Sequence, residues 1–166
     1  IVGDFDSINR DDIKKLEINS IKKFKYNCEK DSTDSDIAME IALKMEFEEI
    51  YMMAMTGSRL DHSFANLGLL SKANSAGAKA YIINETNKIY LLEESSKIKK
   101  DNSYRYISFL AYCDKVENFN IKNAKYDLEN YTLYLGDNRT VSNEFLEEDI
   151  EVEFTKGKIL VMFSKD

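Results

Sequence analysis

The segment Gly3-Asp4-Phe5-Asp6-Ser7 places two carboxylates directly after two β-branched residues. Such residues are typical of the end of a buried strand, and the glycine ends it at no steric cost. Ligands of open α/β sheets bind at the carboxyl ends of strands. Asp4 and Asp6 would repel each other there unless a cation lay between them, and Mg²⁺ takes oxygens from carboxylates and phosphates. The alternative is an ordinary acidic turn that caps the following helix.

Two further polar clusters fall where a predicted strand or loop leads into a predicted helix. One consists of Asp31, Thr33 and Asp34, and the other of Arg59, Asp61 and His62. The first precedes a helix predicted over residues 34–44, whose apolar residues recur at every fourth position. The second separates a strand predicted at 49–55 from a helix predicted at 61–76. Simple helix capping remains an alternative for the first cluster.

The first half of the chain alternates strands and helices, which predicts right-handed βαβ units. From about residue 88 the helical period disappears, and short alternating segments predict strands. Lys156-Gly157 is expected to be a tight hairpin turn between the last two of them. We therefore predict an α/β N-terminal domain over residues 1–90, with a mostly parallel, Rossmann-like sheet. An all-β sandwich or barrel is predicted over residues 91–166.

The composition excludes several function classes. The chain has 166 residues and a net charge of −7 without a basic run, which argues against binding nucleic acid or anionic membranes. No apolar run approaches the roughly 20 residues that span a bilayer. Cys28 and Cys113 have no metal-ligand spacing, which favours free thiols in a reducing cytosol, although one disulfide stays open. Because the chain begins on an isoleucine in an apparent strand, we expect a further segment before it.

The order of these clusters resembles that of the thiamine pyrophosphokinase family. Residues 3–7 match its Gly-Asp-Phe-Asp-Ser motif, and the Asp31 cluster matches its Asp-x-Thr-Asp motif. Its Gly-x-Arg-x-Asp-His motif and the Asn-Leu pair that follows are matched by Gly57, Arg59, Asp61, His62, Asn66 and Leu67. Its Ser-Asn-Glu motif is matched by Ser142, Asn143 and Glu144. The sequence begins after the family's upstream strand and the Asp-Gly-Gly loop that helps to form the nucleotide site. We expect the intact enzyme to carry those residues, and a protein that truly began at Ile1 to bind nucleotide poorly.

The resemblance implies transfer of pyrophosphate from ATP to thiamine, giving thiamine diphosphate and AMP in the cytoplasm. It makes residues 1–90 the nucleotide-binding catalytic domain and residues 91–166 the thiamine-binding domain. It implies a homodimer with shared active sites. The implied Mg²⁺ ligands are Asp4, Asp6, Asp31 and Asp34, and the implied catalytic residues are Asp34, Asp61 and Arg59. The implied contacts to ATP or thiamine are Asp4, Asp6, Ser7, Asp31, Thr33, Arg59, Thr140, Ser142 and Asn143.

Several alternatives remain open from the residues alone. Either Asp34 or Asp61 could accept the proton of the thiamine hydroxyl. The loop at residues 136–144 could be a solvated connection. At the level of function, the alternatives are an inactive thiamine- or nucleotide-binding regulatory module and a phosphatase with a nucleophilic aspartate.

Overall fold

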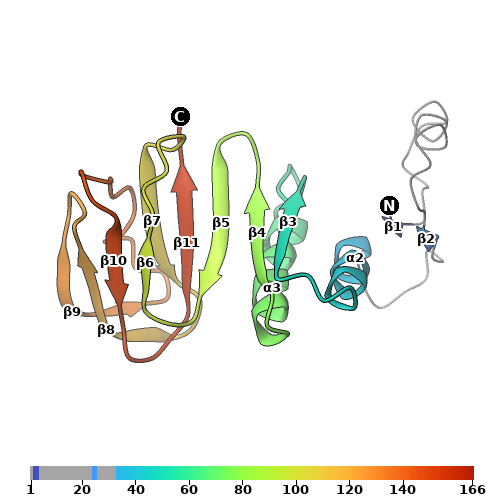
Figure 1. Ribbon diagram of the computed structural model, residues 1–166, viewed down its shortest axis with the longest axis horizontal. Helices are drawn as coiled ribbons and strands as arrows, with labels where there is room; N and C mark the ends of the chain where they lie inside the picture. Colours follow the sequence, from blue (N-terminus) through green and yellow to red (C-terminus); the bar gives the residue numbers. More distant parts are fainter. Residues whose placement is uncertain (1, 4–23, 26–32) are drawn as a thin grey trace. The chain divides into compact units, whose positions relative to one another are not determined.

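The computed structural model describes residues 2–3, 24–25 and 33–166 (Figure 1). The chain divides into two units, Ile1–Glu48 and Glu49–Asp166. In the first unit, β1 (Val2–Gly3) pairs in parallel with β2 (Phe24–Lys25). The helix α2 (Asp34–Leu43) follows and buries Met39.

The second unit begins with a strand, a helix and a parallel strand. The strands β3 (Glu49–Met53) and β4 (Lys79–Ile83) lie side by side, and α3 (Leu60–Ser75) connects them. Figure 1 shows α3 behind these two strands. The face of α3 that is buried carries Asn66, Leu69, Leu70 and Ala73. The helix ends before Gly77, whose φ of 82° permits the sharp exit that a side chain would hinder.

The sheet that contains β3 and β4 continues with antiparallel strands. Its order is β3-β4-β5-β11-β7, with β5 at Asn87–Leu92, β11 at Ile159–Ser164 and β7 at Tyr106–Ala111. Strand β11 therefore lies between two strands that come much earlier in the chain.

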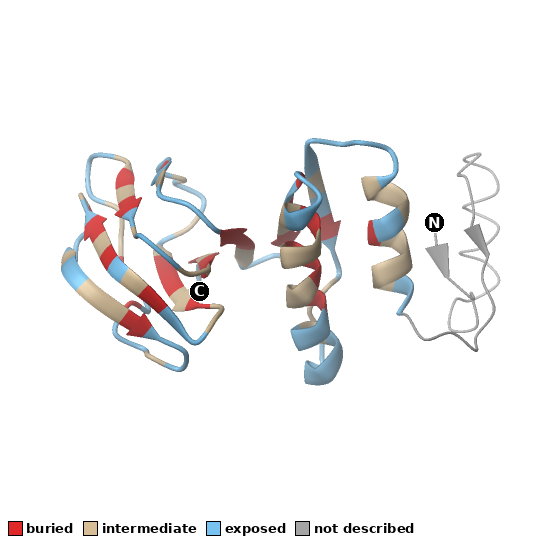
Figure 2. Cartoon of the chain, turned by 90° about the horizontal axis from the view of Figure 1, so that it is seen from below, coloured by how far each residue is buried: buried red, intermediate tan, exposed pale blue. Residues whose placement is uncertain are grey.

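A second sheet of four antiparallel strands packs against part of the first. Its order is β6-β10-β8-β9, and its strands are Ser96–Ile98, Ile150–Glu153, Lys115–Lys122 and Leu128–Tyr134. Both sheets contribute to one apolar core, in which Phe109, Phe119, Leu133 and Val161 are fully buried. Figure 2 colours the buried residues red along the strands of both sheets. Burial of these side chains is the main stabilising contribution to this unit.

The predicted fold class, a Rossmann-like α/β domain with a mostly parallel sheet, is wrong. In the described residues the chain is mostly β, with two helices, and the five-stranded sheet is mixed. The reason lies in the turn after β4, where the Asn84 carboxamide oxygen accepts hydrogen bonds from the amides of Thr86 and Asn87. So short a connection can join only antiparallel strands, which ends the parallel series after one pair.

The predicted hairpin at Lys156-Gly157 is also wrong. Strand β10 pairs with β6 and β8, whereas β11 pairs with β5 and β7, so this segment passes from one sheet to the other. Strand β6 was missed because three residues are too few to show a period. No helix in the described part of the chain is long and apolar enough to cross a membrane. The domain boundary at residue 90 stays a prediction.

Candidate functional site

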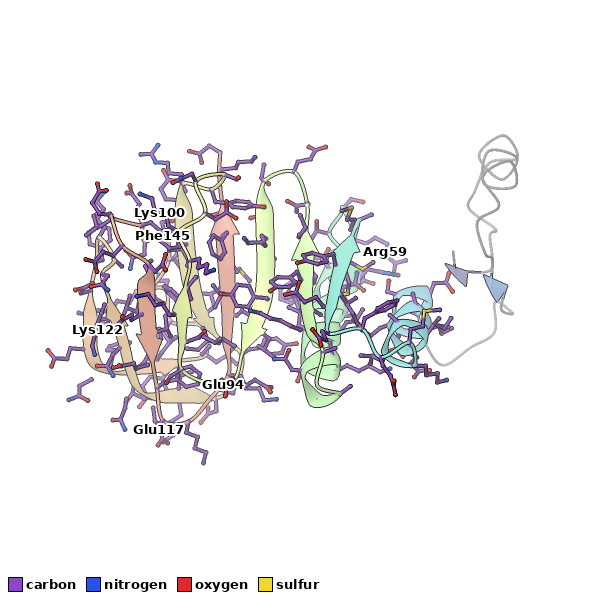
Figure 3. All side chains as sticks on the ribbon, in the orientation of Figure 1. Arg59, Glu94, Lys100, Glu117, Lys122 and Phe145 are labelled. Carbon is purple, nitrogen blue, oxygen red and sulfur yellow. The ribbon has the colours of Figure 1, made fainter. Side chains whose placement is uncertain are left out.

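The loop between β3 and α3 carries an exposed pair of opposite charges. The Arg59 guanidinium donates from Nε to Asp61 Oδ1 at 3.2 Å and from Nη2 to Asp61 Oδ2 at 2.6 Å. The two side chains are 70% and 66% exposed. Arg59 is the last residue before the helix, and Figure 3 labels it beside β3. The pair is therefore open to solvent. Asp61 fixes the orientation of the Arg59 guanidinium, a group that is well suited to bind phosphate.

Hydrogen bonds from both sides anchor this loop. The Asn66 amide donates to the Met55 carbonyl at 2.8 Å from α3, and the Asn84 amide donates to Thr56 Oγ1 at 2.9 Å from the β4–β5 turn. Ala54 adopts a φ of 59°, which is costly for a residue with a Cβ. The role of Asn84 was not predicted from the sequence. The one feature that could have indicated it is its position in a polar turn, Asn84-Glu85-Thr86-Asn87.

The Arg59 pairing decides how Asp61 titrates. The two hydrogen bonds from Arg59, with a further one from the backbone of His62, lower the pKa of Asp61 from 3.8 to about 2. Asp61 is therefore ionised throughout the neutral range and has little tendency to take a proton. The sole histidine of the chain, His62, lies exposed beside it.

The start of α2 carries the second described cluster. Thr33 is the N-cap, and its hydroxyl accepts a hydrogen bond from the amide of Asp36 at 3.2 Å. Asp34 is the first helical residue, and it is exposed. The predicted position of both residues at a helix N-terminus is confirmed, and the capping role belongs to Thr33.

The loop at residues 136–144 is not merely a solvated connection. Thr140 and Asn143 are 4% and 3% exposed. The Thr140 hydroxyl donates to the Phe109 carbonyl, and the backbones of Asn143 and Ile107 exchange two hydrogen bonds of 2.9 Å. The loop is thus joined to β7, and two of its three predicted thiamine contacts are buried.

Ser142 differs from its two neighbours. Its side chain is exposed, and its backbone has a φ of 58°, in the left-handed region. The Ser142 amide donates to the Ser108 hydroxyl at 2.9 Å, which helps to hold that conformation. Residues held in such conformations are frequent at binding sites.

A cavity of about 300 Å³ opens beside this loop. It is lined by Ile121, Tyr126, Asp127, Leu128, Arg139, Thr140 and Asn143. The Arg139 guanidinium lies 5.0 Å from the centre of the Tyr131 ring, and the Tyr131 hydroxyl donates to Asp137 at 2.5 Å. Tyr126, Asp127 and Arg139 were not singled out from the sequence, because their segment matches none of the quoted motifs.

Four of the predicted site residues, Asp4, Asp6, Ser7 and Asp31, lie outside the described residues. Asp34 and Thr33 belong to the first unit, and Arg59, Asp61, Thr140, Ser142 and Asn143 to the second. Across the described ranges, no group of three histidine, cysteine, aspartate or glutamate side chains could hold a metal ion. Carboxylate oxygens suit Mg²⁺, but Asp34 is the one predicted ligand that the structure describes. The common metal site of the four aspartates therefore stays a prediction.

Comparisons with known proteins match most of the chain to one family. The family model of the thiamin pyrophosphokinase catalytic domain matches residues 1–82, and that of the vitamin B1 binding domain matches residues 95–159. The thiamine pyrophosphokinase of Bacillus subtilis (strain 168) is 32% identical over 165 residues, which are 99% of this chain and 77% of that protein.

Solved structures show the same similarity. The crystal structure of thiamine pyrophosphokinase from Bacillus subtilis has a TM-score of 0.91 at 30% identity and covers 99% of this chain and 77% of its own. That of thiamin pyrophosphokinase from Geobacillus thermodenitrificans has a TM-score of 0.86 at 28% identity, over 99% and 76% of the two chains.

Proposed function

Because this chain belongs to the thiamine pyrophosphokinase family, we propose that it transfers the pyrophosphoryl group of ATP to the hydroxyethyl oxygen of thiamine. The products are thiamine diphosphate and AMP. The observation that carries this conclusion is that both domain models match, one after the other, along the chain. The exposed Arg59–Asp61 pair falls within the stretch that matches the catalytic domain.

The reaction requires alignment and charge neutralisation more than covalent catalysis. The thiamine hydroxyl oxygen attacks the β-phosphorus of ATP. The bond from that phosphorus to the oxygen bridging to the α-phosphorus breaks, and AMP leaves with the electron pair. We assign Arg59 to bind the phosphates, because its guanidinium donates in a fork and Asp61 already fixes its direction.

The hydroxyl proton needs an acceptor, for which the residues alone left Asp34 and Asp61 open. The lowered pKa of Asp61 and its two hydrogen bonds from Arg59 make it a poor acceptor. We therefore propose that Asp34 accepts the hydroxyl proton and that Asp61 orients the Arg59 guanidinium. We propose Asp4, Asp6, Asp31 and Asp34 as ligands of Mg²⁺, which would neutralise phosphate charge when bound.

We further propose that the protein is a cytoplasmic homodimer, formed mainly through its β-rich half. The 136–144 loop would face the nucleotide-binding part of the other subunit, so that both subunits complete each site. Burial of Thr140 and Asn143 leaves Ser142 as the loop residue whose hydroxyl is suited to contact thiamine. A two-fold interface would create two equivalent sites.

A coupled assay of AMP release tests the function. We expect release from wild-type protein to need thiamine, ATP and Mg²⁺ together, and thiamine diphosphate to form in equal amount. Arg59→Gln should strongly lower the rate of AMP release. The control is Arg105→Gln, which changes an exposed arginine directly before β7 and should leave that rate unchanged. AMP release that is independent of thiamine would overturn the proposal.

Mixing two inactive variants tests the shared site. Asp34→Ala and Ser142→Ala protein should regain part of the activity after subunit exchange, because a heterodimer keeps one site with both residues. Verified exchange without recovery, or a monomer at assay concentration, would refute the shared site.

A further inference from the structure

The turn between β4 and β5 is firmly attached to the sheet. The Asn84 carboxamide oxygen accepts from the amides of Thr86 at 2.9 Å and Asn87 at 2.7 Å, and from Asn87 Nδ2 at 3.1 Å. The Lys165 amide, directly after β11, donates to the Thr86 carbonyl at 3.0 Å. Asn87 is also the first residue of β5, which pairs with β11 along its whole length. The turn therefore offers a fixed point next to more open loops.

This arrangement sets the direction of the Asn84 amide group. Because the carboxamide oxygen faces the amides of the turn, the Nδ2 group faces away from them, and it donates to Thr56 Oγ1 at 2.9 Å. Figure 1 shows the β4–β5 turn at the same end of the sheet as the loop that follows β3. A side chain of the turn thus holds a side chain of that loop.

The loop passes this contact on to Arg59. Thr56 is followed by Gly57, whose amide donates to the Ser63 hydroxyl at 3.3 Å. The same hydroxyl donates to the Arg59 carbonyl at 3.2 Å. Side chains therefore fix the backbone at both ends of the stretch from Thr56 to Arg59, and the guanidinium extends from a backbone that has little room to shift.

The backbone at the start of this loop depends on such contacts. Ala54 has a φ of 59°, a conformation that a residue with a Cβ keeps only where its surroundings determine it. Asn66 supplies one contact, at the Met55 carbonyl, and Asn84 supplies the next, at Thr56. Backbone strain of this kind is frequent where a site must be held in one arrangement before its ligand binds.

We infer that Thr56 and Asn84 are positioning residues for the phosphate-binding arginine. The turn that sets the rate of transfer then lies between the two stretches that match the family models, residues 1–82 and 95–159. This role rests on the proposed function, in which Arg59 binds the phosphates of ATP. Both side chains act through the backbone of Arg59 rather than on a substrate. Reactions that depend on alignment slow by about a hundredfold when a group is displaced by about 1 Å.

Steady-state kinetics on the full chain separate positioning from turn formation. Thr56→Val removes the hydroxyl that Asn84 holds and leaves the hydrogen bonds within the turn untouched. It should lower kcat about ten- to a hundredfold, while the KM for thiamine stays nearly constant and Tm falls by a few degrees at most. Thr56→Ser keeps the hydroxyl and should keep most of the rate. Thr132→Val, which removes a half-buried hydroxyl on β9, is the control and should leave kcat unchanged.

A double variant tests whether the two residues act through one contact. Asn84→Ala removes the anchor and also the acceptor of the turn, so it should lower Tm and kcat together. Adding Thr56→Val to Asn84→Ala should lower kcat no further, because both changes break the same hydrogen bond. Losses of kcat that add up fully in the double variant would overturn the inference.

Hydrogen–deuterium exchange without nucleotide reports on the loop independently of activity. Peptides that span residues 54–63 should exchange faster in Thr56→Val than in the wild type and in Thr56→Ser. Unchanged exchange in Thr56→Val, or faster exchange together with a wild-type kcat, would overturn the inference. If the wild type releases no AMP although exchange differs as expected, the proposed function is refuted instead.

Discussion

Removing the side chain of Asn143 should destabilise the β-rich unit. Asn143→Ala deletes three hydrogen bonds of 2.8 to 3.0 Å from a residue that is 3% exposed. Each such bond contributes about 1 kcal/mol net, so the expected loss in the free energy of unfolding is about 3 kcal/mol. For a chain of this size that loss lowers Tm by about 6–12 °C.

Urea and thermal unfolding followed by circular dichroism measure this loss. Asn143→Asp keeps the accepting oxygen but places a carboxylate oxygen against the Tyr126 carbonyl, and should be destabilising as well. Asn102→Ala, at an exposed turn residue, is the control. One buried polar group left without a partner costs about 1–3 kcal/mol. If Asn143→Ala lowers the free energy of unfolding by less than about 1 kcal/mol, the reasoning is refuted.

Three further outcomes are expected. Gly157→Ala should cost at least about 2 kcal/mol in thermal unfolding, because a Cβ there would lie 2.8 Å from Val116 Cα and the φ is 131°. The ion pair between Asp61 and Arg59 should persist at neutral and mildly acidic pH and be lost as the pH falls from 3.8 through about 2, where Asp61 takes up a proton. In Arg59→Gln, a carbon-13 NMR titration should find that the pKa of Asp61 has risen towards 3.8. Asp34→Asn should lower kcat far more than Tm, and parallel losses of both would indicate instead that Asp34 only stabilises the first turn of α2.

Local signals in the sequence predicted the βαβ part of the fold well. The strand at 49–55 and the helices after Thr33 and Arg59 follow from short-range patterns and are observed close to their predicted positions. The predicted fold class was wrong because of the short turn at Asn84, which follows β4. One turn there decides whether the next strand is parallel, and a periodicity argument does not register a turn.

The site shows the same division between local and long-range information. The motif spacing placed Arg59 and Asp61 at one helix start, where the structure joins them. The roles of Thr140 and Asn143 depend instead on Phe109, Ile107 and Tyr126, which are distant in sequence. The family resemblance implied ligand contacts for Thr140 and Asn143, whereas pairing across the fold uses both side chains internally.

The central place of β11 has a consequence for how the chain is made. Strands β5 and β7 acquire their shared neighbour only when residues 159–164 have been synthesised. Until then, a nascent chain has two apolar strand edges without a partner, which is the condition under which other chains can add to them. Closure of the sheet is therefore a late, long-range event, and folding should be slow for a chain of this length. Loss of the last strand should yield an aggregating protein rather than a slightly less stable one.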